Sequence, residues 1–290
     1  MADGAAAVDL AQLMGVLRPR LHRYCARMVG SAFDGEDVVQ DALAKAIDAW
    51  PAAGAIERPE AWLFRIAHNT ALDALRRRKR QAQVAARLDP PASDAGADAR
   101  VAASASLAVL MQLPPAQRSC VILIDVLGHS LEETLDILGV TAPAAKAALH
   151  RGRAKLRGLA ALADPPARSL DAEAATRLRA YADHFNARNF DALRALLAED
   201  VRLDLVNRTR LLGRKDVSVY FTRYDQAPFQ WRMGPGLADG RPAILVSDPS
   251  EATDAIRWVV LLDWREGQIH GIRDFLYARY AMDGVTITRL

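Results

Sequence analysis

The chain reads DGEDVVQDAL at residues 34–43 and RPEAWLFRIAHNTALDALRRR at residues 58–78. In both stretches the apolar side chains recur every three or four residues, which is the period of an amphipathic α-helix. Asp34 predicts the start of the first helix, because a carboxylate suits a helix N-terminus, and Pro51 predicts its end. Pro59 suits the first turn of the second helix, which runs into five consecutive cations at residues 76–80.

A further apolar stripe precedes these two helices. Its members share one helical face: Leu10, Met14, Leu17, Leu21, Tyr24 and Met28. Gly30 follows the stripe and predicts the end of that helix. The three helices together predict a compact bundle over residues 8–82. Residues 83–105 are rich in Ala, Asp, Ser and Pro and lack large apolar periodicity, so we interpret them as a linker.

Residues 106–163 have the pattern of a helix-turn-helix unit. A first helix ends at Gly128, Ser130 predicts the N-cap of a short helix, and Gly139 ends that helix. A last helix begins at Thr141 and has no acid up to residue 163, whereas five cations occur in it: Lys146, Arg151, Arg153, Lys155 and Arg157. Two helices joined by a glycine turn and followed by a basic helix are typical of DNA-binding proteins.

The character of the chain changes after Asp-Pro-Pro at residues 164–166, and we take residues 164–168 as a connector. A helix through Ala174 and Phe185 and a short helix at 191–197 come first. Four β-like runs follow: Val201–Val206, Ala243–Ser247, Ile256–Trp264 and Gln268–Tyr277, the last two joined by a hairpin turn at Arg265-Glu266-Gly267. A long helix followed by a curved antiparallel sheet predicts an α+β domain over residues 169–290.

The composition is that of an ordinary globular protein. Of 290 residues, 51% are hydrophobic and 25% charged, which excludes disordered, collagen-like and disulfide-scaffold chains. The two cysteines form no CxxC pair, so no zinc ribbon can be drawn. The N-terminal residues carry acids rather than a basic region, and no apolar run reaches the length of a membrane helix. We therefore expect a cytoplasmic protein that makes no use of a membrane.

The distribution of charge is more informative than the net charge of +3. Residues 164–290 hold 18 basic and 18 acidic residues, so the whole excess of cations lies in residues 1–163. There it is concentrated in the run at residues 76–80 and in the basic helix after Thr141. Local basic blocks within balanced flanks indicate contacts with a polyanion, although either block alone could be a solvated helix face.

The quoted stretches resemble region 2 of the bacterial sigma-70 family, and in particular its extracytoplasmic-function (ECF) subgroup. LPPAQR at residues 113–118, LGHSLEETLDILGV at residues 127–140 and HRGRAKL at residues 150–156 resemble region 4 of the same family. Both matches occur in the family's order with a linker between them. Residues 170–290 resemble, by element order and the closing hairpin, the cone-shaped SnoaL-like (NTF2-like) fold that some such factors carry as an extension. The resemblance implies a multidomain chain of two all-α domains, the region 2 bundle and the region 4 helix-turn-helix, plus one α+β cone.

The resemblance implies two surfaces on region 2. The acids and amide of the first quoted helix face the clamp helices of the largest subunit of core RNA polymerase in the family: Glu36, Asp37, Gln40 and Asp41. The second helix holds the melted −10 promoter element, and its candidates are Arg65, His68, Asn69, Asp73, Arg76, Arg77, Arg78 and Arg80. Cations suit phosphate, and amides and planar groups suit unstacked bases.

For region 4 the resemblance implies contact with the −35 element through the last helix and with the flap of the polymerase. The candidates are Thr141, Ala144, Lys146, Ala147, His150, Arg151 and Arg153. The N-terminal half of this helix is expected in the major groove with cations flanking it. Its alanines give a slim surface with few groups for hydrogen-bond readout.

The C-terminal domain contains no recognised catalytic motif. The chain has no GxxxxGK[ST], GxSxG or HExxH sequence, and we expect no catalytic residue, no metal and no cofactor. Four side chains are candidates to line a pocket of the cone: His184, Tyr220, Trp231 and His270. Binding of a small ligand, catalysis and docking against another part of the chain stay open. The acids Asp263, Glu266, Asp274 and Asp283 are candidates for a docking surface.

The leading interpretation is a sigma factor, not an enzyme, that binds core RNA polymerase and promoter DNA and is modulated by its own C-terminal domain. The alternative is a ligand-sensing or enzymatic SnoaL-like domain fused to a DNA-targeting module. A third interpretation is a plain helix-turn-helix repressor, but a repressor has no need of the region 2 helices.

Overall fold

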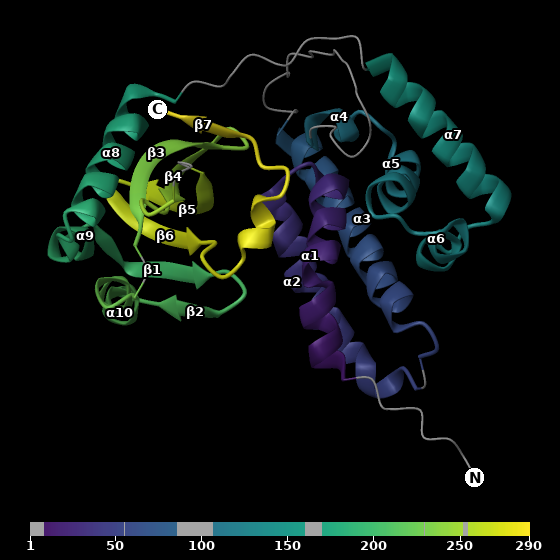
Figure 1. The fold of residues 1–290 in the computed structure, drawn as a ribbon, viewed down its shortest axis with the longest axis horizontal. Helices are drawn as coiled ribbons and strands as arrows, with labels where there is room; N and C mark the ends of the chain where they lie inside the picture. The colour runs from purple at the N-terminus through teal and green to yellow at the C-terminus, as the bar shows by residue number, and fades with distance from the viewer. Residues whose placement is uncertain (1–8, 55, 86–106, 160–169, 229, 252–254) are drawn as a thin grey trace. The chain divides into compact units, whose positions relative to one another are not determined.

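The computed structural model describes residues 9–54, 56–85, 107–159, 170–228, 230–251 and 255–290. The chain divides into two compact units, Met1–Pro165 and Pro166–Leu290, and each is described by itself. Figure 1 shows a helical first unit and a second unit built around a sheet. In the part of the chain that is described, no helix is both long and apolar enough to span a membrane.

The first unit begins with a bundle of three helices, α1 (Leu10–Val29), α2 (Ala32–Ala49) and α3 (Pro59–Ala85). Gly30 ends α1 in the left-handed conformation, with φ of 77°, as the sequence predicted. The start of α2 differs from the prediction. Ser31, not Asp34, is the N-cap, and its hydroxyl accepts the amide N–H of Asp34. Asp34 instead occupies the first turn, where its charge still complements the helix dipole.

A single 3₁₀ turn, Trp50–Ala52, follows α2 at the predicted Pro51 stop. Apolar burial holds the three-helix bundle together. Tyr24 and Met28 of α1 and Leu63 and Phe64 of α3 are almost wholly excluded from solvent in one cluster. α3 continues past residue 82 to Ala85, so the first residues of the expected linker are helical. The remainder of that linker, like the 164–168 connector, lies outside the described residues.

The second half of the first unit has the expected helix-turn-helix order. Its elements are α4 (Leu107–Met111), α5 (Pro115–Val121), a π-helical turn (Ile122–Val126), α6 (Leu131–Leu138) and α7 (Ala142–Leu159). The π-helical turn interrupts what the sequence predicted as one continuous helix. Ser130 caps α6 in a capping box with Glu133, and Gly139 ends it in the left-handed conformation. These two signals define the beginning and the end of α6.

The second unit is α+β. Its elements are α8 (Ala172–Asn186), α9 (Phe190–Ala195), β1 (Leu197–Leu205), β2 (Thr209–Leu212), α10 (Arg214–Asp225), β3 (Arg232–Ala238), β4 (Arg241–Ser247), β5 (Ile256–Arg265), β6 (Gln268–Asp274), a 3₁₀ turn (Arg279–Met282) and β7 (Ile287–Arg289). The strands form one sheet in the order β2-β1-β6-β5-β4-β3-β7. The expected α+β class is confirmed, but the sheet is mixed rather than antiparallel, because β1 pairs with β6 in parallel.

The sheet curls around α8, which packs on β3 and β4, while α10 packs on β1 (Figure 1). The predicted hairpin joins β5 and β6 through Glu266 and Gly267, both with positive φ, as a two-residue turn requires. The interior is filled by aromatic side chains. Phe185 of α8 lies within about 6 Å, ring to ring, of five others: Tyr181, Phe190, Phe221, Tyr224 and Trp231.

Candidate functional site

The acids of α2 separate into a buried and an exposed set. Asp37 and Asp41 are exposed and Gln40 is half-buried. Glu36 is fully buried and forms an ion pair with Arg18 of α1, so it has no surface to offer a partner. This corrects the expectation for Glu36 alone. Unpaired burial of a carboxylate is costly, and the ion pair with Arg18 compensates for it.

The outer face of α3 carries the expected DNA-binding side chains. Arg65, Asn69, Asp73 and Arg76 follow one another at helical spacing, and all four are exposed. His68 does not belong to this face. It is 8% exposed, and its Nδ1 lies 2.7 Å from the hydroxyl of Tyr24. Burial, assisted by the charge of Arg76, lowers the pKa of His68 to about 4. His68 is therefore a neutral part of the bundle core, which corrects the expectation that it contacts DNA.

The basic run at the end of α3 is not uniform. Arg76 is paired with Asp73 of the preceding turn at 2.9 Å, whereas Arg78 binds the Asp34 carboxylate and the carbonyl of Val29, the latter at 3.0 Å. Arg78 thereby connects α3 to the α1–α2 turn. Arg77 and Arg80 are exposed. A groove of about 220 Å³ has Asp37 and Asp41 among its acidic lining residues and Arg77 and Arg78 among its basic ones.

The last helix of the helix-turn-helix unit, α7, presents its expected side chains outward. Thr141, Ala144, Lys146, His150 and Arg151 are exposed, and Ala147 is half-buried. Arg153 is exposed too, but its guanidinium makes a two-pronged contact with the carboxylate of Asp125, at 2.9 and 2.5 Å. We assign Arg153 to holding α7 against the π-helical turn. Ala145, Ala148 and Gly152 form the opposite, buried face.

The four candidates for a cone pocket do not converge on one cavity. The hydroxyl of Tyr220 is buried and donates to Asp274 at 2.9 Å, and Tyr224 donates to the same carboxylate at 2.7 Å. Asp274 is itself fully buried, with a raised pKa, so the expectation that it forms part of an exposed acidic surface is wrong. His270 Nδ1 lies 2.9 Å from a carboxylate oxygen of Asp200.

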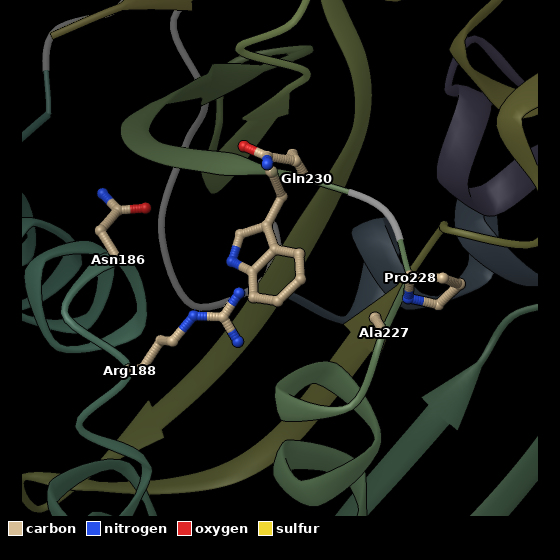
Figure 2. Close-up of a pocket in the computed structure, with 6 residues that line it drawn as sticks. Asn186, Arg188, Ala227, Pro228 and Gln230 are labelled. Carbon is tan, nitrogen blue, oxygen red and sulfur yellow. The ribbon is translucent and has the colours of Figure 1, made fainter.

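Of the four, Trp231 lines a cavity with a volume of about 200 Å³. Figure 2 shows this cavity with Asn186 and Arg188 in its wall. The guanidinium of Arg188 lies over the Trp231 ring at 4.7 Å from the centroid. Asn186 is locked in the wall because its amide both donates to and accepts from the backbone of Met233. Arg188 has a positive φ of 55° and a long contact with Asp225, and the sequence carried no signal for its position.

The described residues contain no group of His, Cys, Asp and Glu side chains arranged to hold a metal ion. Cys25 and Cys120 are both buried free thiols. Burial raises the pKa of each, so neither has the character of a reactive cysteine.

Comparison with known proteins accounts for this arrangement of the first unit. The sigma-70 region 2 family matches residues 13–81, and the sigma-70 region 4 family matches residues 106–156. The RNA polymerase sigma-E factor of Streptomyces coelicolor is 32% identical over 160 residues, which cover 55% of this chain and 90% of that protein. The chain belongs to the ECF sigma factors of the sigma-70 family.

Another relative of this sigma factor is the ECF sigma factor SigM of Mycobacterium tuberculosis, which is 34% identical over 143 residues, covering 48% of this chain and 71% of that protein. A solved structure of a ketosteroid-isomerase-like protein from Kribbella flavida is 29% identical and covers 35% of this chain and 73% of its own, with a TM-score of 0.26. In the sigma factor, the region 2 match covers α2 and most of α1 and α3, and the region 4 match ends within α7.

Some residues of the first unit have structural roles that the sequence did not indicate. Arg118 is 3% exposed, and its guanidinium donates to the carbonyl of Met28 at the end of α1 and to that of Leu113 at 2.8 Å. A cation at the C-terminus of α1 complements the helix dipole. Arg118 is the last residue of the quoted LPPAQR stretch, so the family resemblance marked its position but not its partners.

Proposed function

We propose that this sigma factor binds core RNA polymerase through the exposed face of α2 and promoter DNA through α3 and α7. The observation that carries the proposal is the exposure of charged side chains of both signs on one bundle. Asp37 and Asp41 are exposed on α2, while the exposed cations Arg65, Arg76 and Arg77 lie on α3. The acids offer contacts to a protein partner and the cations offer contacts to a polyanion, and the two sets meet at the groove that Asp37, Asp41 and Arg77 line.

The proposed contacts on DNA divide into two groups. On α3, Arg65 and Asn69 face the melted −10 element, with Arg76, Arg77 and Arg80 on phosphate. On α7, Lys146, His150 and Arg151 face the −35 element, and the small side chains of Ala144 and Ala147 permit close approach. A factor with these partners would act in the bacterial cytoplasm.

The C-terminal unit acts in this proposal as a regulator without catalytic activity. Its interior is filled by aromatic rings, and a fully buried carboxylate, that of Asp274, is bonded to two tyrosine hydroxyls and to the amide of Leu276. A base so enclosed has no access to a substrate. A ligand of this unit would bind instead at the cavity beside Arg188 and Trp231 (Figure 2).

Polymerase binding is tested by reversing the charge of the exposed α2 acids. Asp37→Lys/Asp41→Lys should lower the affinity for purified core RNA polymerase at least tenfold, because like charges then meet at the contact. The matched control is Asp183→Lys/Asp216→Lys, which makes the same change in net charge at exposed positions of the second unit. Equal affinity of the two variants for core would refute the proposed contact.

A further inference from the structure

The cavity of the second unit is built by three short segments: the residues that end α8, those that follow α10 and those that precede β3. Its described lining consists of Asn186, Arg188, Ala227, Pro228, Gln230 and Trp231. None of the buried aromatic side chains of the interior is among these lining residues. The volume of about 200 Å³ is smaller than the roughly 300–1,000 Å³ of pockets that enclose drug-sized molecules, so a ligand that fits here has to be small.

Arg188 reaches this cavity from a backbone conformation that is unfavourable for an arginine. Its amide N–H donates to the carbonyl of Phe185 at 3.0 Å, and that of Asn189 donates to the carbonyl of His184 at 2.9 Å. These bonds end α8 with Arg188 in the left-handed region, at φ of 55°. Glycine is the usual residue at such a helix end, because it adopts positive φ without a steric cost. A non-glycine residue kept in this conformation beside a cavity indicates a role for its side chain.

The guanidinium of Arg188 is held in place with one edge to spare. Its Nη1 donates to the main-chain carbonyl of Asp225 at 3.2 Å and to the Asp225 carboxylate at 3.3 Å. Its Cζ lies 4.7 Å from the centre of the Trp231 ring. Both hydrogen bonds that it makes within the described residues come from Nη1, so the Nη2–Nε edge can serve a ligand. Figure 2 shows the Arg188 side chain pointing from the turn after α8 into the cavity.

The free edge of Arg188 defines the charged group of the ligand. Two parallel N–H groups of a guanidinium match the two oxygens of a carboxylate. The described lining holds one cation, Arg188, which already faces the carboxylate of Asp225. A singly charged carboxylate therefore suits the site better than a phosphate, which carries up to two negative charges.

The remaining lining defines the body of the ligand. The rings of Trp231 and Pro228 offer flat apolar surface, on which an aromatic ring packs well. The Asn186 amide is engaged in both directions with the backbone of Met233, so it fixes the wall and leaves no polar group there to be satisfied. The exposed amide of Gln230 is available for one polar substituent.

We propose that this cavity binds a small aromatic monocarboxylate, with the carboxylate on the Nη2–Nε edge of Arg188 and the ring against Trp231 and Pro228. The inference deepens the proposed function, on which it rests in one respect: that function locates a ligand of the second unit at this cavity. It adds the chemical class of the ligand and the residue that selects it.

Binding is measured by isothermal titration calorimetry of the full chain with benzoate, and with benzamide as its neutral counterpart. Benzoate should bind at one site, at least tenfold more tightly than benzamide, because only the carboxylate can accept both N–H groups of Arg188. Arg188→Gln should weaken benzoate binding at least tenfold. The matched control is Arg223→Gln, which removes an exposed arginine of α10 outside the lining and should leave the affinity unchanged. Equal affinity of the two variants for benzoate, or no binding at millimolar concentrations, would overturn the proposal.

The location of the site is measured on the wild-type chain and so does not depend on the folding of a variant. The five tryptophans give five indole N–H signals in a nitrogen-15 NMR spectrum, and Trp231→Phe identifies the signal of Trp231. Benzoate should shift that signal more than the other four. A larger shift at another indole would overturn the proposal. Tighter binding of a tripeptide that ends in phenylalanine than of benzoate would indicate capture of a chain end, and would overturn it too.

Neither measurement uses polymerase or DNA, so this inference and the proposed contacts of the first unit fail separately. A protein that does not bind benzoate can still initiate transcription. A protein that binds benzoate at Arg188 but not core RNA polymerase would refute only the contacts of the first unit.

Discussion

Gly35 shows how one residue sets the approach of two helices. A Cβ at this position would lie 2.6 Å from the backbone nitrogen of Ala26 and 2.5 Å from its Cα, so α1 and α2 would have to separate. Gly35→Ala should therefore destabilise region 2 by about 2–3 kcal/mol, as overpacking against backbone does. The measurement is the midpoint of thermal unfolding of the full chain.

The control for Gly35 is another helical glycine of the same bundle. A Cβ on Gly15 of α1 would meet nothing within 4 Å, so Gly15→Ala should stabilise by about 0.5–1 kcal/mol through helix propensity. Equal effects of the two substitutions would show that α1 and α2 are not in close contact at Gly35.

His68 makes the stability of region 2 depend on pH. Its pKa is about 4 in the fold against an ordinary value of 6.5, so the unfolded chain binds the proton more strongly between these values. The contribution of His68 to the free energy of unfolding is fully present above pH 6.5 and is lost as the pH falls toward 4. The loss is about 3 kcal/mol at most. His68→Gln should remove the part of the pH dependence of stability that His68 causes. Unfolding midpoints of both proteins at pH 7 and pH 5 test this, and parallel pH dependences would contradict it.

The sequence could separate inward from outward side chains only as far as helical periodicity allows. Asp37 and Asp41 lie on the predicted exposed face, and the structure leaves them exposed. Glu36 and His68 are polar residues that the bundle buries, because Arg18 and Tyr24 provide partners on another helix. A partner distant in sequence is invisible to local patterning, and so both residues were assigned to the surface.

At the scale of elements, the basic end of α3 serves two purposes. Arg78 is tied to Asp34 and the Val29 carbonyl, whereas Arg77 is exposed. Arg76→Ala/Arg77→Ala should flatten the dependence of promoter binding on salt, by roughly 0.7–0.9 units of slope for each phosphate that the variant no longer neutralises. Core binding should be unaffected.

Arg78→Ala is the matched control for that double substitution, since it removes a neighbouring cation that is already engaged within the bundle. It should change the slope less than Arg77→Ala does. Filter binding or anisotropy over a series of salt concentrations gives both slopes. A slope unchanged by Arg76→Ala/Arg77→Ala would identify the run as a solvated helix face.

The elements that were predicted are those with strong local signals. The glycine stops, the Ser130 cap and the hairpin at Glu266–Gly267 are encoded within a few residues, and the structure confirms them. α10, β2, β3 and β7 were not predicted. β3 contains two glycines and a proline, residues that local sequence patterns associate with loops. Its pairing with β4 and β7 overrides that preference. The parallel pairing of β1 with β6 depends on contacts between segments distant in the sequence, and no local sequence pattern indicates it.

At the scale of the whole molecule, the second unit is electrically balanced and is therefore not expected to add affinity for DNA. We expect it to act through the first unit, at the high effective concentration that a short connector provides. Truncation after Ala163 should change promoter-dependent transcription several-fold, in either direction, while regions 2 and 4 stay folded. Equal activity of the truncated and full-length proteins across salt concentrations and temperatures would show that the second unit does not regulate transcription.

The most direct test of the central claim is run-off transcription by purified core RNA polymerase on linear genomic fragments from the organism that encodes this factor. We expect discrete transcripts with defined start sites when the factor is added, none of them with core alone, and their disappearance with Asp37→Lys/Asp41→Lys but not with Asp183→Lys/Asp216→Lys. Transcripts that are the same with and without the factor would contradict its assignment as an initiation factor.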